Sequence, residues 1–250
     1  MTLHYESYGS GQRTLVFVHY FGGDSNSWKW VTKRLKRKFH IVTITLPGFG
    51  RTTPLTEPSI YHFAKYINAC LNDLELKDFI LCGHSMGAKL VLYATQLRQK
   101  SAPMGIVLVA PSPPTVEEMP QQEKERMLQH PNHQQAEQTV DRATCKRLPV
   151  KRRQHAIDTQ LAADPDTWSW WLQKGMTHSI ADRIPGVVVP TYVICAKKDP
   201  VISMNTIFEE VLPHLHEPKL MQLGKCGHLI PLESPRKLAR QLKKIARTLG

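Results

Sequence analysis

Short runs of apolar and β-branched residues recur along the chain, separated by longer stretches in which apolar residues return at helical spacing. The central runs are apolar throughout, which is typical of strands buried on both faces, as in a parallel sheet. The clearest predicted strands cover residues 14–19, 41–46, 79–82, 106–110, 191–196 and 219–223. An earlier strand around residues 3–8 is expected to form a hairpin with residues 14–19 through Gly9-Ser10-Gly11.

Helical patterns fall between the predicted strands, at residues 25–37, 59–75, 85–99, 203–212 and 234–249. In the last of these, Ser234 is suited to cap the helix and Pro235 to occupy its first turn. This alternation of strand and helix predicts the α/β class, with a doubly wound, mostly parallel sheet.

One stretch breaks the alternation. Residues 112–185 carry no strand pattern, and helical patterns follow one another at residues 117–129, 134–146, 150–163 and 167–174. We therefore divide the chain into an α/β core of residues 1–111 and 186–250 and a helical insertion of residues 112–185, expected to cover the carboxyl edge of the sheet as a lid. The alternative, an unrelated second domain, is disfavoured because the stretch is short and embedded between two strands.

The net charge of +12 raises the question of a polyanionic partner. Basic residues cluster at residues 33–38, 146–153 and 236–247. In the last cluster, apolar residues recur at helical spacing between the charges, which is typical of an amphipathic helix docked on a core. No nucleic-acid-binding module is visible, so we expect no nucleic-acid partner. A preference for anionic substrates or acidic surfaces stays open.

The cysteines and the apolar runs limit the remaining classes. The five cysteines are scattered without a CxxC pair, which disfavours a disulfide framework and a zinc site. No run of eighteen apolar residues occurs, and the first residues lack the features of a signal peptide. We expect no membrane span, no metal and a cytoplasmic location, and the pattern leaves the oligomeric state open.

The segment Gly83-His84-Ser85-Met86-Gly87 lies between a predicted buried strand and a predicted helix. A serine on such a tight strand-to-helix turn has strained backbone angles, needs small neighbours two residues away, and projects its hydroxyl above the sheet. The helix that follows also directs its positive N-terminal end at the serine. A glycine-rich turn without chemistry is the alternative, but the context favours Ser85 as a nucleophile.

This segment resembles the nucleophile elbow of the α/β-hydrolase superfamily, and the resemblance extends over essentially the whole chain. It implies a histidine base, because a serine hydroxyl is a poor nucleophile until a base takes its proton. Among twelve histidines, His228 follows the last predicted strand in a loop that resembles the family's histidine loop, with Gly227 before it and Glu233-Ser234-Pro235 after it. His84, which precedes the nucleophile, is expected to support the site rather than act as the base.

The acid that orients the base is expected at Asp199, which follows the predicted strand of residues 191–196. The chain order of Ser85, Asp199 and His228 agrees with the superfamily. Asp199 could also be a turn-forming Asp-Pro. A rival acid position after residues 106–110 reads Pro111-Ser112-Pro113 and holds no carboxylate, which favours Asp199.

An oxyanion hole needs two well-placed N–H donors. The resemblance implies the backbone N–H of Met86 as one donor. The other is Phe21, because His19-Tyr20-Phe21 resembles the family's His-Gly-x segment. Tyr20 stands where the family has glycine. Its ring could narrow the pocket, its hydroxyl could assist the oxyanion, or the side chain could only pack in the core.

Aromatic residues of the insertion are candidates for the substrate pocket. Trp168, Trp170 and Trp171 are too closely spaced to share one helix face, so only some of them can face the site. We take Trp168 and Trp171, with Tyr20, as the pocket candidates. Packing within the insertion is the alternative for each tryptophan.

A serine nucleophile disfavours the dehalogenases and epoxide hydrolases of this superfamily, which attack through a carboxylate. The resemblance implies hydrolysis of a carboxylic ester through an acyl-enzyme, with no cofactor. Lactones and the diketones cleaved by carbon–carbon hydrolases require the same three residues, and some relatives act on peroxide, so these alternatives stay open. A ligand-binding protein without catalysis is the alternative of another class.

Overall fold

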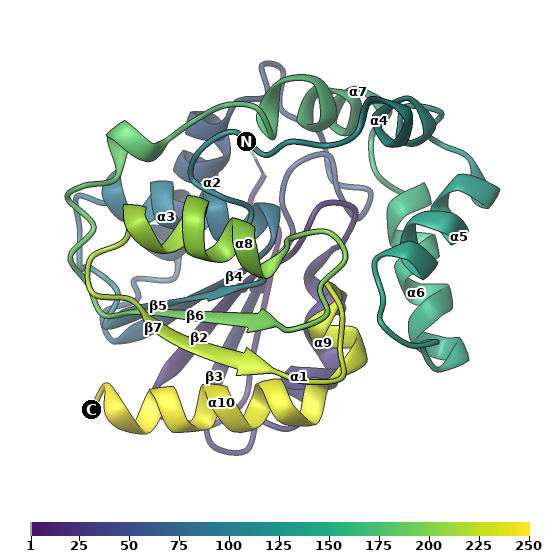
Figure 1. The fold of residues 1–250 in the computed structure, drawn as a ribbon. Coiled ribbons are helices and arrows are strands. Elements are labelled where there is room, and N and C mark those ends of the chain that lie inside the picture. The colour runs from purple at the N-terminus through teal and green to yellow at the C-terminus, as the bar shows by residue number, and fades with distance from the viewer. Residues whose placement is uncertain (1) are drawn as a thin grey trace.

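The computed structural model describes residues 2–250 and is built on one seven-stranded sheet with the strand order β1-β3-β2-β4-β5-β6-β7 (Figure 1). Strand β1 is antiparallel to its neighbour, and all the other strand pairs are parallel. The predicted α/β class with a mostly parallel sheet is confirmed. The strands are β1 (Tyr5–Tyr8), β2 (Thr14–Val18), β3 (His40–Ile44), β4 (Phe79–His84), β5 (Gly105–Val109), β6 (Thr191–Ala196) and β7 (Lys219–Leu223).

Consecutive side chains of each central strand enter different cores, because side chains alternate between the two faces of a sheet. In β2, Val16 and Val18 belong to the core on one face, while Leu15 and Phe17 belong to the core on the other. Helices α2 (Ile60–Asp73) and α3 (Met86–Gln96) cover the first face, and α1 (Lys29–Thr32) and α10 (Pro235–Thr248) cover the second (Figure 1). Both faces are therefore buried, as the apolar strands require.

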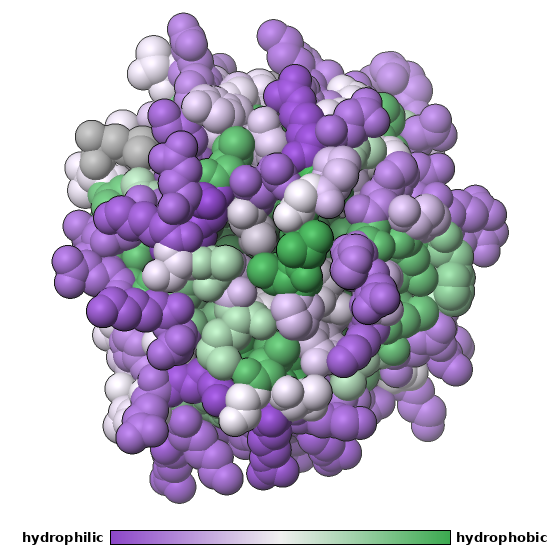
Figure 2. Space-filling view, turned by 90° about the vertical axis from the view of Figure 1, so that its left-hand side faces the viewer, coloured by the Kyte–Doolittle hydropathy of each residue, from purple (hydrophilic) through white to green (hydrophobic). Residues whose placement is uncertain are grey.

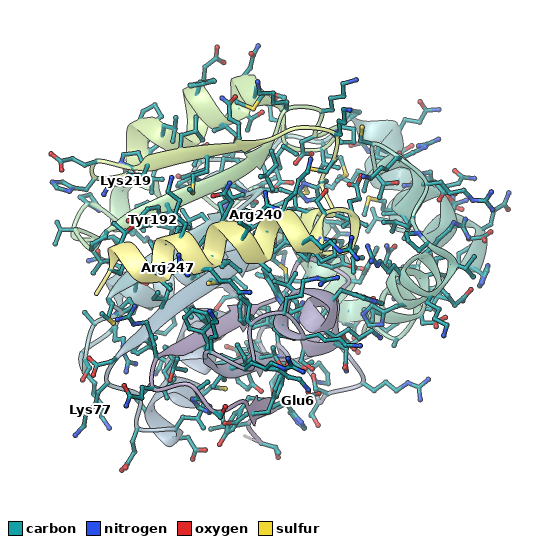
Figure 3. The ribbon with its side chains drawn as sticks, turned by 90° about the horizontal axis from the view of Figure 1, so that it is seen from below. Glu6, Lys77, Tyr192, Lys219, Arg240 and Arg247 are labelled. Atoms are coloured by element: carbon teal, nitrogen blue, oxygen red, sulfur yellow. The ribbon has the colours of Figure 1, made fainter. Side chains whose placement is uncertain are left out.

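Helix α10 explains one of the three basic clusters. Leu238, Leu242 and Ile245 are buried against the sheet, while Arg236, Lys237, Arg240, Lys244 and Arg247 are exposed. Figure 3 views the molecule from this side, with α10 lying across the sheet and Arg240 and Arg247 on it. The predicted amphipathic helix docked on a core is confirmed.

Hydrophilic residues occupy most of the face in Figure 2, and apolar residues gather near its centre. The most exposed large apolar side chains, Val150 and Val188, lie in different parts of the chain. Scattered apolar side chains of this kind are normal on a protein surface. Among residues 2–250, no helix has the length and apolar character needed to cross a membrane.

The predicted hairpin between β1 and β2 is wrong. Strand β1 pairs antiparallel with β3, with Tyr5 opposite Ile44 and Tyr8 opposite Ile41. Both edges of β2 are already paired, to β3 and β4, so the first strand can join the sheet only at the free edge of β3. The residues between β1 and β2 pass over the turn before β3, where a Cβ on Gly9 would lie 2.4 Å from the Phe39 carbonyl oxygen.

The last helix begins where it was predicted, with Ser234 at the N-cap position and Pro235 in the first turn. The Ser234 carbonyl accepts from the Leu238 amide at 3.0 Å, but its side chain makes no capping hydrogen bond at the start of α10. A short helix that was not predicted, α9 (Ile230–Glu233), comes immediately before it, and the Ser234 amide donates to the Ile230 carbonyl. Ser234 is therefore a junction between two helices rather than the start of an isolated one.

Two other predicted helices are shorter or less regular than expected. The pattern at residues 25–37 becomes a 3-10 turn (Ser25–Trp28) and α1, followed by further turns. The pattern at residues 203–212 becomes α8 (Met204–Thr206), a π turn (Ile207–Val211) and a 3-10 turn (Leu212–His214). Their apolar spacing is helical, but neither segment completes a long regular helix.

The insertion between β5 and β6 is helical, and residues 112–185 contain no strand. Its helices are α4 (Gln121–Met127), α5 (His133–Arg142), α6 (Val150–Leu161) and α7 (Pro165–Trp170), followed by a π turn (Trp171–Gly175) and a 3-10 turn (Ala181–Arg183). These helices lie at the side toward which the arrowheads of β6 and β7 point (Figure 1). The insertion is thus beside the carboxyl ends of the parallel strands, where open α/β sheets bind ligands.

Helix α3 packs unusually close to the end of β2. A Cβ on Gly87 would lie 2.3 Å from the His19 carbonyl oxygen and 2.7 Å from that of Val18. In an exposed helix, replacing glycine by alanine stabilises by about 1 kcal/mol. We predict the opposite for Gly87→Ala, a loss of about 1–3 kcal/mol in the free energy of unfolding, because backbone atoms must move apart.

Chemical denaturation measures this difference, and Gly224→Ala is the matched control because its Cβ would meet no atom within 4 Å. If Gly87→Ala unfolds at the same denaturant concentration as Gly224→Ala, the close approach of α3 to β2 does not constrain the fold.

Candidate active site

Ser85 lies at the junction of β4 and α3 with φ 54° and ψ −119°, a strained conformation for a residue with a side chain. Its amide donates to the Val109 carbonyl at 3.0 Å, and its carbonyl accepts from the Ser112 amide at 3.2 Å. Gly83 and Gly87 allow the strand and the helix to meet, since a Cβ on Gly83 would lie 2.4 Å from the Gly87 carbonyl oxygen. The strained turn predicted from the sequence is confirmed.

Ser85, His228 and Asp199 form one hydrogen-bonded series. The Ser85 hydroxyl lies 2.9 Å from His228 Nε2, and His228 Nδ1 lies 2.9 Å from Asp199 Oδ2. With a carboxylate at Nδ1, that nitrogen carries the proton and Nε2 can accept from the hydroxyl. The three residues come from the ends of β4, β7 and β6, and all three are buried.

Backbone amides fix the Asp199 carboxylate. The amides of Val201 and Ile202 donate to its Oδ1 at 2.8 and 2.9 Å, which leaves Oδ2 for His228. The Asp-Pro sequence therefore forms a turn and also places the Asp199 carboxylate against His228.

The electrostatics of His228 combine opposing effects. Burial of the ring lowers the pKa of His228, but the Asp199 charge and hydrogen bond raise it, with weaker contributions from Glu117 and Glu233. The net result is a pKa above the ordinary histidine value. The imidazole is thus well suited to hold a proton taken from Ser85.

His84 supports the backbone of His228. Its Nε2 lies 2.9 Å from the His228 carbonyl oxygen, so Nε2–H donates, and no partner for the buried Nδ1 occurs within residues 2–250. Burial and the neighbouring His228 lower the pKa of His84 well below its ordinary value, so the ring is neutral. His84 holds the position expected of a supporting residue.

His19 fixes the loop that carries Phe21. Its Nε2 accepts from the Leu46 amide at 3.1 Å, so its Nδ1 carries the proton that is donated to the Tyr20 carbonyl at 2.8 Å. Burial lowers the pKa of His19 to about 4, which keeps the ring neutral. Within residues 2–250 the Phe21 and Met86 amides donate no hydrogen bond, so both N–H groups are free for another acceptor.

Tyr20 lies between the core and the insertion. Its ring packs 5.1 Å from His84, centroid to centroid, and contributes to a core cluster with Val140, Ala156 and Leu229. The buried hydroxyl lies beside Thr159, and burial raises the pKa of Tyr20. The ring also lines the cavity described next, so this position fits packing and narrowing of the pocket.

A cavity of about 730 Å³ is lined by Ser85 and His228 from the α/β core and by residues of the insertion. Its aromatic and aliphatic wall includes Tyr20, Phe21, Met127, Trp168, Trp171 and Leu229. Trp168 is held by its indole N–H, which donates to the Met127 carbonyl at 2.8 Å. Trp170 instead packs on Phe63, 5.3 Å between ring centroids, so two of the three tryptophans face the cavity.

The sequence analysis missed three charged residues around the site. Glu117 lines the cavity and accepts a hydrogen bond from Ser112. Ser112 belongs to the segment after β5 that was considered as a rival position for the acid and that holds no carboxylate. Lys89 is fully buried and donates to the carbonyls of Thr115 and Met176 at 2.8 and 3.4 Å. The only sequence feature that could have pointed to Lys89 is its position as a lysine in an otherwise apolar part of α3. Glu117 lies in no motif, so no such feature points to it.

The third missed residue is Glu233, which was noted only as part of the histidine loop. Its carboxylate accepts from the Gly227 amide at 2.8 Å and from the Cys145 amide at 3.1 Å. The His228 amide also donates to the Ala143 carbonyl at 2.9 Å. The second and third of these hydrogen bonds join the histidine loop to the insertion, and the first fixes the loop internally. The part of the chain that the structure describes has no cluster of three or more potential metal ligands.

Comparison with known proteins agrees with this architecture. Residues 15–241 match the model of the alpha/beta hydrolase family. The chain is 24% identical over 237 residues to the pimeloyl-[acyl-carrier protein] methyl ester esterase of Legionella pneumophila, which covers 92% of each chain. Among solved structures it is similar to an esterase from Exiguobacterium antarcticum, with a TM-score of 0.87 and 18% identity, covering 98% of this chain and 95% of that one.

A meta-cleavage product hydrolase from Pseudomonas fluorescens is also similar in structure, with a TM-score of 0.82 and 15% identity over 99% of this chain and 95% of that one. At such identities the solved structures establish the fold. Because the family model matches most of its length, the chain belongs to the alpha/beta hydrolase family.

The electrostatic balance at His228 generates a testable prediction. In Asp199→Asn the main effect opposing burial is removed, so the pKa of His228 falls below its value in the unmodified protein. NMR titration of the His228 ring measures the shift, with the signal assigned by its loss in His228→Gln. Asp182→Asn, at an exposed aspartate, is the control and leaves the titration unchanged. An unshifted His228 in Asp199→Asn would contradict the described geometry.

Proposed function

We propose that this protein is a carboxylic ester hydrolase in which Ser85 is the nucleophile, His228 the general base and acid, and Asp199 the orienting acid. The observation that carries the proposal is the buried hydrogen-bonded series from Ser85 to His228 to Asp199, with Ser85 and His228 lining the cavity. Such a series activates a hydroxyl that is otherwise a weak nucleophile.

In the first half of the reaction, Ser85 Oγ attacks the ester carbonyl carbon while its proton moves to His228 Nε2. The carbonyl oxygen becomes an oxyanion, and the free amides of Phe21 and Met86 are the proposed donors that stabilise it. When the tetrahedral intermediate collapses, the bond to the alkoxy oxygen breaks. His228 Nε2–H then protonates the departing alcohol.

The second half of the reaction repeats the same steps with water. His228 Nε2 takes a proton from water, and the hydroxide oxygen attacks the acyl carbon. The bond to Ser85 Oγ breaks, Oγ recovers its proton from His228, and the carboxylic acid leaves. Throughout, Asp199 remains ionised and stabilises the imidazolium.

Two observations favour an acyl ester as the substrate. The similarity to an esterase of an acyl-[acyl-carrier protein] methyl ester extends over 92% of both chains. The cavity of about 730 Å³ has an aromatic and aliphatic wall beside Ser85, which suits an acyl chain. Lactone and carbon–carbon bond hydrolysis remain alternatives that the same three residues could perform. A non-catalytic binding role is disfavoured by the complete hydrogen-bonded series.

The insertion of residues 112–185 is proposed to be the lid, with residues 1–111 and 186–250 as the α/β core. Helices α4, α5 and α7 contribute Met127, Thr139, Arg142 and Trp168 to the cavity wall. A lid in this position excludes water from the reacting carbonyl and shapes the substrate pocket. The proposed substrate contacts in this pocket are Trp168 and Trp171 of the insertion and Tyr20 of the core. The cytoplasmic location stays a prediction.

A fluorophosphonate probe tests the nucleophile directly, because it phosphonylates an activated serine. We predict one covalent adduct, on Ser85, located by mass spectrometry of the digested protein. Ser85→Ala takes up no probe, whereas Ser101→Ala, at an exposed serine, reacts like the unmodified protein. An adduct at another serine, or none, would overturn the assignment of Ser85.

Turnover of a p-nitrophenyl ester tests the base and the acid. Ser85→Ala and His228→Ala are each expected to lower kcat by about a thousandfold or more, since the residues act as one unit. Asp199→Asn is expected to reduce kcat strongly, because the His228 tautomer and charge lose their support. Full activity in Asp199→Asn would mean that the acid is misassigned.

A further inference from the structure

Glu117 is a carboxyl group held at the wall of the reaction cavity. Its amide donates to the Met176 carbonyl at 2.9 Å, and its Oε2 accepts from the Ser112 hydroxyl. The Ser112 amide in turn donates to the Ser85 carbonyl. The Glu117 carboxyl is therefore fixed through a single residue to the backbone of the nucleophile.

One oxygen of this carboxyl is uncommitted. Within residues 2–250, Oε1 of Glu117 has no hydrogen-bond partner, and Glu117 forms no ion pair within 4.0 Å. Lys89 is the charge that most lowers the pKa of Glu117, but its ammonium group donates to the carbonyls of Thr115 and Met176 instead. Burial raises the pKa of Glu117, while Ser112 and Lys89 oppose that effect.

The cavity that Glu117 lines also has a largely aromatic and aliphatic wall, which includes Phe21, Trp168 and Trp171. A substrate that fills this space displaces water from the free carboxyl oxygen. An apolar acyl chain would leave that oxygen buried and unpaired, which costs binding energy, whereas a donor on the substrate would satisfy it. A site with a buried acceptor strongly rejects a substrate that lacks the matching donor. This selectivity is far greater than that of an apolar pocket between substrates that differ by one methylene group.

The remaining charges of the cavity oppose an anionic substrate group. Four glutamates line it, Glu117, Glu118, Glu123 and Glu125, against the arginines Arg126 and Arg142. Both arginines are bound to Glu123, which neutralises part of their charge. The cavity is thus acidic although the chain carries a net charge of +12.

We propose that Glu117 is a specificity-determining residue that accepts a hydrogen bond from a hydroxyl group on the acyl part of the substrate. The preferred substrates are then hydroxylated acyl esters, ahead of unsubstituted acyl esters and well ahead of esters that carry a second, free carboxylate. This inference rests on the proposed ester hydrolysis at Ser85 and adds the chemistry of the acyl group that reaches it.

Matched methyl esters test the inference. The set contains methyl hexanoate, its derivatives with one hydroxyl at each successive carbon, and the monomethyl ester of adipic acid. For the unmodified protein, kcat/KM is expected to be at least about tenfold higher for one hydroxylated ester than for methyl hexanoate, the effect of one well-made hydrogen bond. The adipate ester is expected to be the poorest substrate.

Three variants separate the roles of the carboxyl. In Glu117→Leu the preference for the hydroxylated ester over methyl hexanoate falls to about one. Glu117→Gln keeps an acceptor, so it retains most of the hydroxyl preference but hydrolyses the adipate ester faster than the unmodified protein does. Glu209→Leu, at an exposed glutamate of the π turn after α8, leaves both ratios unchanged.

The outcomes distinguish this inference from the proposed function. If no methyl ester is hydrolysed, the proposed function fails. If the unmodified protein hydrolyses methyl hexanoate and every hydroxylated ester with the same kcat/KM, ester hydrolysis stands and the role of Glu117 is refuted, without need of any variant. An undiminished hydroxyl preference in a folded Glu117→Leu would refute it as well.

Discussion

The positive φ of Ser85 is the constraint on which the rest of this site depends. A residue with a side chain adopts that conformation only where the surrounding structure over-determines it. Here the Val109 carbonyl and the Ser112 amide hold the Ser85 backbone from the side of β5, while α3 packs against the end of β2 through Gly87. The turn thereby joins three neighbouring strands at their carboxyl ends, and every other functional group is positioned relative to it.

Three buried histidines around this turn differ in role because their partners differ. The ring nitrogens of His19 and His84 form hydrogen bonds only with backbone groups, and burial keeps both rings neutral, so each ring fixes the position of a loop. For His228, burial lowers the pKa, but the charge and hydrogen bond of Asp199, together with Glu117 and Glu233, raise it above the ordinary value. The same type of side chain thus differs in its electrostatics according to its neighbours, and the composition of a chain with twelve histidines does not reveal that difference.

Local patterns predicted the features that depend on local order. The strands at residues 191–196 and 219–223 have the predicted bounds, and Ser85, Asp199 and His228 meet because parallel strands deliver the residues after them to one edge. The pairing of β1 could not be predicted in this way, since it depends on which sheet edge is left free. Ser234 takes the predicted N-cap position of α10, but the short helix α9 before it was not predicted and the Ser234 side chain makes no capping hydrogen bond.

Glu117 shows why the insertion is harder to interpret than the core. Its environment is formed by the nearby Ser112 and by Met176 and Lys89, which are distant in sequence, and no short motif records such an arrangement. Lys89 is buried in the first turns of α3, so a single helix carries Ser85 at its start and a lysine that is hydrogen-bonded to the insertion. The positions of Ser85 and Glu117 thus both depend on α3. Ser85 lies at the start of this helix, and Lys89 of the same helix holds the segment that presents the Glu117 carboxyl to the substrate.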